Sequence, residues 1–148
     1  MLLRYQSLWL REGKLYLPTM GKTPFGLYTE VEPVEILPPE LGALVPRLEV
    51  ALKREPPPTP DPPAGASWPT SVVQKAARQK SWLAFSKAAL GIALIESEAG
   101  WDVAGTIAKG REPLEVEKIS VGRTESAQVL GEAVLALAGR WSIWADQK

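Results

Sequence analysis

A run of prolines most constrains what this chain can fold into. Residues 56–63 contain six of the fourteen prolines in the 148-residue chain. Because proline fixes φ and lacks a backbone N–H, we expect this run to join neither a helix nor a sheet and to form an extended connector. Recognition by a proline-reading domain is the less favoured alternative. The connector separates residues 1–55 from residues 64–148, and we expect the two parts to form one compact domain.

The first part carries the pattern of a β-rich half. Short β-prone runs at residues 7–10 and 14–17 flank an Arg-Glu-Gly turn, which predicts a hairpin. Residues 27–37 predict a further strand, in which Pro33 marks a bulge, an edge or the start of a second strand.

One helix completes the first part. Apolar residues from 41 to 52 fall on a single helical face. Because Pro46 lies within that face, the helix is either kinked there or begins near Val45.

The second part opens with two expected helices. Thr70 or Ser71 can cap a helix over residues 72–78. Ser81 can cap another over residues 82–90.

Strands and a last helix follow. Residues 91–97 and 101–107 predict a hairpin, and residues 114–121 predict a third strand. The apolar phase of that third strand shifts after Val116, which indicates a bulge. Thr124 is expected to cap the final helix.

Both parts therefore run hairpin, strand, helix, and short matches link them. Glu32-Pro33 resembles Glu112-Pro113, and Leu41-Gly42 resembles Leu130-Gly131, at spacings of 80 and 89 residues. Duplication and chance similarity of amphipathic helices both remain open. The sequence predicts an α+β fold with an antiparallel sheet and three or four helices, arranged as two related β-β-β-α halves if the duplication is real.

Composition excludes several kinds of chemistry. The chain has no histidine and no cysteine, so it has no disulfide, no thiolate nucleophile, no Ser-His-Asp triad and no zinc site of the usual kind. Its 17 basic and 17 acidic residues balance, which argues against a wholesale polyanion binder. The fourteen prolines and the abundance of Glu are typical of thermophile proteins. Without a signal peptide or a membrane-spanning apolar run, a bacterial cytoplasmic protein that needs no cofactor is expected.

Carboxylates are the remaining candidates for catalysis. Glu30 with Glu32, or Glu115 with Glu117, would project from one face of a strand and could share a proton or bind Mg²⁺. A solvated sheet face whose acids pair with nearby cations such as Lys118, Lys109 or Arg111 is the favoured interpretation. We therefore expect no catalytic residue, no metal site and no enzyme.

Charge is unevenly distributed along the chain. Residues 53–90 hold six cations and two acids, whereas the flanking parts are acidic. Three of these cations, Lys75, Arg78 and Lys80, precede Trp82 in one short stretch. With Trp82 they could contact phosphates and stack a base, although the shared face of Trp82 and Phe85 favours core packing. Nucleic-acid binding through residues 75–87 is therefore the alternative function.

Tryptophan is unusually abundant. The chain has six, more than a core of this size needs, and exposed tryptophans are common interface anchors. Trp141 and Trp144 are the candidates for a protein interface.

Several motifs in the second part resemble a known family. The runs Lys-Ser-Trp-Leu-Ala-Phe-Ser-Lys at 80–87, Glu-Pro-Leu-Glu at 112–115 and Leu-Gly-Glu-Ala-Val-Leu-Ala-Leu at 130–137 are similar to those of immunity proteins of bacterial contact-dependent growth inhibition systems. The similarity covers residues 74–140. It implies a non-enzymatic α+β protein that binds a cognate toxin domain and covers its active site.

The leading expectation is therefore protein binding, with a toxin domain as the concrete partner. The candidate partner-binding residues are Lys75, Arg78, Lys80, Trp141 and Trp144. Nucleic-acid binding and a carboxylate-metal enzyme are the alternatives.

Overall fold

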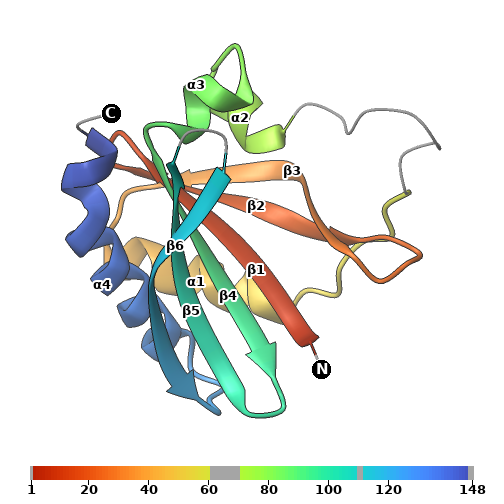
Figure 1. Cartoon of the computed structure of the whole chain (residues 1–148). Coiled ribbons are helices and arrows are strands. Elements are labelled where there is room, and N and C mark those ends of the chain that lie inside the picture. Colours follow the sequence, from red (N-terminus) through yellow and green to blue (C-terminus); the bar gives the residue numbers. More distant parts are fainter. Residues whose placement is uncertain (1, 61–70, 110–111, 147–148) are drawn as a thin grey trace.

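One six-stranded antiparallel sheet with four helices forms the described part of the chain, which in this computed structural model is residues 2–60, 71–109 and 112–146 (Figure 1). The expected α+β class is confirmed. In chain order the elements are β1 (Leu2–Arg11), β2 (Lys14–Lys22), β3 (Tyr28–Leu37), α1 (Leu41–Lys53), α2 (Val72–Ala76), α3 (Trp82–Ser86), β4 (Ala89–Ser97), β5 (Gly100–Lys109), β6 (Glu112–Gly122) and α4 (Ala127–Asp146).

Two β-β-β-α units meet at the centre of the sheet. The strand order is β3-β2-β1-β4-β5-β6, so the first strands of the two units pair with each other. This seam is long, because β1 and β4 stay in register from Arg4 opposite Glu96 to Arg11 opposite Ala89. Each unit ends in a long helix, and α1 packs against α4 (Figure 1).

The spacing between equivalent positions differs from the spacing that the sequence motifs indicated. The first residues of α1 and α4, Leu41 and Ala127, are 86 positions apart. The same offset relates Leu44 to Leu130, and both side chains are buried. The matched Leu41-Gly42 and Leu130-Gly131, at a spacing of 89, therefore do not occupy equivalent positions in the two helices. Duplication of the two halves stays a prediction.

The main core lies between the sheet and the two long helices. Leu8 on β1 and Leu94 on β4 belong to the same core cluster as Leu48 on α1 and Leu137 on α4. All four side chains are fully buried. On this side Arg4 forms a two-pronged ion pair with Glu96 across the seam, with N–O distances of 2.7 and 3.2 Å. The Glu96 carboxylate, chiefly by this hydrogen bond, raises the pKa of Arg4.

The other face of the sheet is covered at one end by α2 and α3. Successive strand residues point to opposite faces, so Trp9 faces away from the core that holds Leu8. There a second cluster forms around four buried residues, Tyr16, Val73, Phe85 and Ala89. The short helices lie over this cluster at one end of the molecule (Figure 1).

The β1–β2 hairpin is paired only at its closed end. Backbone pairing joins β1 to β2 at Trp9, Leu10 and Arg11 and stops there. Beyond this point the side-chain Nε2 of Gln6 donates to the carbonyl of Pro18 at 2.9 Å and bridges the diverging strands. The divergence opens a space on the face that α2 and α3 cover in part.

The proline run does join the sheet, contrary to expectation. The N–H of Lys22 donates to the carbonyl of Pro57, and the N–H of Thr59 donates to the carbonyl of Lys22, each at 3.0 Å. A proline carbonyl still accepts hydrogen bonds, and Thr59 supplies the donor that the prolines lack. Residues 61–70, which include the rest of the run and the start of the second part, lie outside the described residues.

Local features follow the sequence with some corrections. A bulge was expected between Val116 and Ile119, and the register shift falls at Val116 itself, because Thr106 of β5 pairs with Glu115 and Gly105 pairs with Glu117. The helix expected over 82–90 is wrong in length, because α3 ends at Ser86 and the chain enters β4 at Ala89.

The first residues of the helices differ in part from those expected. Ser126, rather than Thr124, accepts from the N–H of Val129 at the start of α4. Pro46 lies inside α1, which already begins at Leu41, so the start near Val45 was wrong. Ser71 caps α2 as expected by accepting from the N–H of Gln74, whereas Thr70 lies outside the described residues. Within the described ranges the helices are too short or too polar to cross a bilayer.

Candidate functional site

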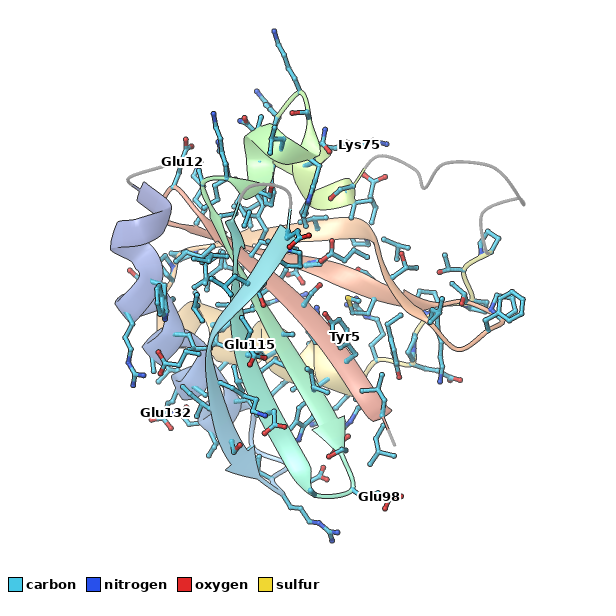
Figure 2. All side chains as sticks on the ribbon, in the orientation of Figure 1. Tyr5, Glu12, Lys75, Glu98, Glu115 and Glu132 are labelled. Atoms are coloured by element: carbon cyan, nitrogen blue, oxygen red, sulfur yellow. The ribbon has the colours of Figure 1, made fainter. Side chains whose placement is uncertain are left out.

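The basic residues singled out in the sequence lie together on the α2–α3 pair. Lys75, Arg78 and Lys80 are exposed, as is Lys87, and residues 71–95 contain no acid. In the described part of the chain none of these four cations has an ion-pair partner. Figure 2 shows Lys75 at the α2–α3 end of the molecule, away from Glu98 and Glu132. This end therefore carries four exposed cations that have no ion-pair partner among the described residues.

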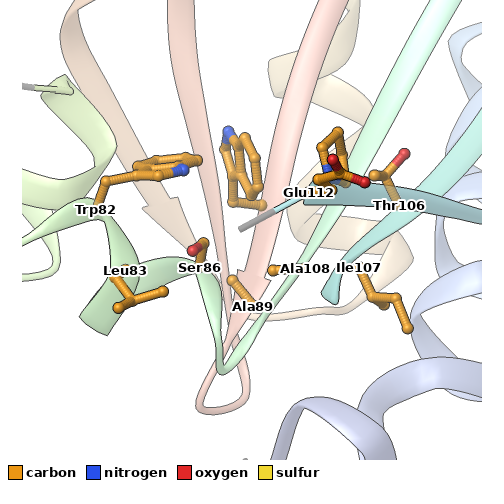
Figure 3. Close-up of a pocket in the computed structure, with 10 residues that line it drawn as sticks. Trp82, Leu83, Ser86, Ala89, Thr106, Ile107, Ala108 and Glu112 are labelled. Carbon is orange, nitrogen blue, oxygen red and sulfur yellow. The ribbon is translucent and has the colours of Figure 1, made fainter. Parts of the chain in front are cut away.

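A pocket of about 440 Å³, which we call the α3 pocket, lies beside these cations. Trp82, Leu83 and Ser86 of α3 form one side, and residues of β5 and β6 form the other (Figure 3). Its lining is mostly apolar, and Glu112 is its one charged residue among the described residues. A pocket of this composition suits an apolar side chain.

Trp82 is only partly packed. Its ring stacks on Phe85 at 5.3 Å and meets the edge of Trp9 at 5.0 Å between ring centroids. Yet 42% of Trp82 and 52% of Leu83 stay exposed, whereas Phe85 is fully buried. The sequence-based choice of core packing for Trp82 is therefore only partly right: the ring supports the second cluster and also presents a surface.

Of the two C-terminal tryptophans, Trp141 does not join this surface. Trp141 is half-buried on α4, packs against the main core and donates to Glu117 at 3.2 Å. It therefore belongs to the helix-covered side, opposite the α2–α3 pair. Trp144 lies in α4, but its side chain is outside the described residues.

Two of the four candidate carboxylates, Glu30 and Glu117, have hydrogen-bond or ion-pair partners. Glu117 pairs with Arg140, rather than with Lys118 as the sequence suggested, and Glu35 pairs with Arg47. The side chains of Lys109 and Arg111 are outside the described residues. Among the described residues no three acids approach closely enough to hold a metal ion.

Glu30 is placed differently from the other acids. It lies where β1 and β2 diverge, in an open pocket of about 650 Å³ that we call the Glu30 pocket. Four aromatic side chains line this pocket, namely Tyr5, Trp9, Tyr28 and Trp82. Tyr5 lies on β1 in Figure 2, and its ring centroid is 6.1 Å from that of Tyr28.

Hydrogen bonds fix the Glu30 carboxylate. Its Oε2 accepts from the hydroxyl of Ser7 and from the indole Nε1 of Trp9, at 2.5 and 2.6 Å. Burial, and secondarily the negative charge of Glu30, raise the pKa of Tyr5. The carboxylate therefore acts electrostatically on the aromatic wall beside it.

Sequence reasoning missed this pocket. Glu30 was weighed only as half of a carboxylate pair, and Tyr5 and Ser7 were not considered. The period-two alternation along β1 puts Tyr5, Ser7 and Trp9 on one face, and that signal was available. The sequence does not indicate that β1 diverges from β2, and this divergence is what lets Glu30 reach Ser7 and Trp9.

Comparisons with known proteins add no further evidence, because no family model, curated protein or solved structure matches this chain.

Proposed function

We propose that this chain is a non-enzymatic, cytoplasmic protein-binding domain whose binding surface is the α2–α3 pair with the α3 pocket. The observation that carries the proposal is the exposure of Trp82 and Leu83 beside an apolar pocket. Exposed tryptophans that border a pocket are typical anchors of protein interfaces, where a few such residues supply most of the binding energy.

The charge of this surface indicates the chemistry of the partner. Four cations without an ion-pair partner lie on the α2–α3 pair, whose residues 71–95 contain no acid, although Glu112 lines the pocket itself. The complementary partner presents an acidic segment with an apolar side chain for the pocket. In keeping with the resemblance to immunity proteins, we propose a toxin domain with such an acidic patch as that partner.

The test measures binding of purified candidate toxin domains, taken from genes beside the gene for this chain, by calorimetry. The triple variant Lys75→Glu/Arg78→Glu/Lys80→Glu is expected to weaken binding at least tenfold, and Trp82→Ala to weaken it similarly. Lys53→Glu, at the exposed end of α1, is the matched charge control and should bind normally. Absence of binding, together with no protection of cells that produce the toxin, would overturn the immunity role.

Nucleic-acid binding is the second candidate, and the half-exposed ring of Trp82 among free cations favours it. It ranks second because Glu112 and Glu30 line the two pockets beside Trp82, where carboxylates repel phosphates. Fluorescence anisotropy with single-stranded oligonucleotides decides: true phosphate binding weakens steeply with added salt. Affinity that does not change with salt would exclude this role.

A further inference from the structure

We propose that the Glu30 pocket binds an organic cation, namely the alkylammonium group of a small molecule or of a modified lysine. This site is separate in chemistry from the cationic α2–α3 surface, so it stands whether or not the proposed protein partner is correct.

The aromatic walls are the first part of the argument. Tyr5 and Tyr28 lie at one end of the pocket, and Trp9 meets Trp82 nearly at right angles, 88°, at the other. The faces of aromatic rings carry negative charge density and attract cations, most strongly when the cation is poorly hydrated, as a methylated ammonium is. Rings at two ends of one pocket suit a ligand that is both apolar on its surface and positively charged.

Glu30 supplies the formal charge. Both of its hydrogen bonds come from neutral donors, Ser7 and Trp9, and both reach the same oxygen, Oε2. Within the described residues Oε1 has no hydrogen-bond partner and the carboxylate has no ion-pair partner. A partly buried carboxylate held by neutral donors lacks only a counter-ion.

The rest of the lining is consistent with that charge. Apart from Glu30, the described residues that line the pocket are uncharged, so no basic side chain of the lining neutralises it. Lys22 lies outside the lining, with its Nζ 5.3 Å from the Tyr28 ring centroid. The Tyr28 ring thus already contacts one cation from within the chain, so Tyr5, Trp9 and Trp82 are the aromatic walls without such a contact among the described residues.

The first experiment compares two probes of the same shape. Choline carries a trimethylammonium group, and 3,3-dimethylbutan-1-ol has the same shape without the charge. Titrations are followed by the indole N–H signals in ¹H–¹⁵N NMR spectra. Choline should shift the signals of Trp9 and Trp82 saturably, while the buried Trp101, which donates to Thr124, reports that the fold is unchanged. The neutral alcohol should bind at least tenfold more weakly.

A charge variant tests the carboxylate itself. Glu30→Gln keeps an oxygen that can accept from Ser7 and Trp9 but removes the charge, so we expect choline affinity to fall at least tenfold with the Trp101 signal unchanged. Glu98→Gln, at an exposed turn, is the matched control and should retain wild-type affinity. Equal binding of choline and the alcohol, no binding of either, or undiminished affinity in Glu30→Gln would each overturn the proposal.

A second ligand pair identifies the source of the cation. Nα-acetyl-Nε-trimethyllysine methylamide presents the same trimethylammonium group on a protein-like backbone. Tighter binding than choline assigns the pocket to a methylated protein side chain, and weaker binding assigns it to a free small molecule.

Discussion

The indole N–H of Trp9 on β1 donates to the carboxylate of Glu30 on β3 at 2.6 Å, across the strand that separates them in the sheet. This contact exists because β1 and β2 pair only from Trp9 to Arg11 and diverge on the N-terminal side of Trp9, which leaves room for a β3 side chain to reach β1. The hydrogen bond between Trp9 and Glu30 thereby depends on the strand divergence that also opens the Glu30 pocket.

Removal of the Glu30 side chain should destabilise the protein. Glu30→Ala leaves the donors of Ser7 and Trp9 without their acceptor, and an unpaired donor in a partly buried place costs about 1–3 kcal/mol. Glu30→Gln should lose less than half as much stability, because its amide oxygen can still accept from Ser7 and Trp9. Chemical denaturation measures both. Equal losses in the two variants would show that the charge, rather than the acceptor, stabilises this region.

Gly91 should be needed for the position of Trp9. A Cβ at Gly91 would lie 2.9 Å from the Trp9 indole, so the ring must move in Gly91→Ala. We expect altered near-ultraviolet circular dichroism, weaker choline binding and a loss of about 1–3 kcal/mol from overpacking. Gly105→Ala is the matched strand control, since the nearest atom to its added Cβ is 3.6 Å away. An unchanged spectrum in Gly91→Ala would contradict the close approach.

Two turn glycines with positive φ should differ in their tolerance of alanine. Gly13 has φ +72° and open space around an added Cβ, so Gly13→Ala should cost only about 1–2 kcal/mol for the left-handed backbone. Gly100 has φ +121°, and its added Cβ would overlap the backbone of Gly122. Gly100→Ala should therefore lower the melting temperature clearly more than Gly13→Ala. Similar melting temperatures would show that the Gly122 backbone shifts at little cost.

Stability should fall at alkaline pH through two tyrosines. Burial is the main cause that raises the pKa of Tyr5 and of Tyr16 in the folded protein. The folded state then holds these protons to higher pH than the unfolded state, so stability is full below about pH 10 and declines as pH rises further. Between pH 8 and pH 11 the free energy of unfolding should decline less steeply with pH in Tyr5→Phe than in the wild type. The same slope in the variant and the wild type would remove Tyr5 from this account.

Features that depend on neighbouring residues were predictable from the sequence. The bulge beside Val116 follows from a change of apolar phase along one strand, and the Ser71 cap follows from its place before an apolar run. The hairpins were found at their turns, because Glu12-Gly13 and Glu98-Ala99 are local signals. Their strands extend beyond the expected ends, since pairing partners and not propensity set those ends.

Features that depend on distant residues were not predictable. The sheet contact of Pro57 and Thr59 needs an unpaired stretch of β2, and nothing in the proline run indicates that β1 leaves that stretch vacant. The Glu30 pocket arises from the same divergence. Trp82 was misjudged in part because helical spacing shows which residues share a face, but not how completely a short helix covers it.

The long helices α1 and α4 belong to the two similar units, whereas the short helices α2 and α3 lie between them. The two β-β-β-α units are matched in strand order and helix placement, and they alone make the main core. Within the described ranges the α2–α3 pair has no counterpart: it lies between the two units and covers one end of the sheet face opposite the long helices. Both candidate pockets border this pair. Replacement of the pair would therefore alter both pockets without touching the main core, although it would uncover Tyr16 and Ala89 of the second cluster.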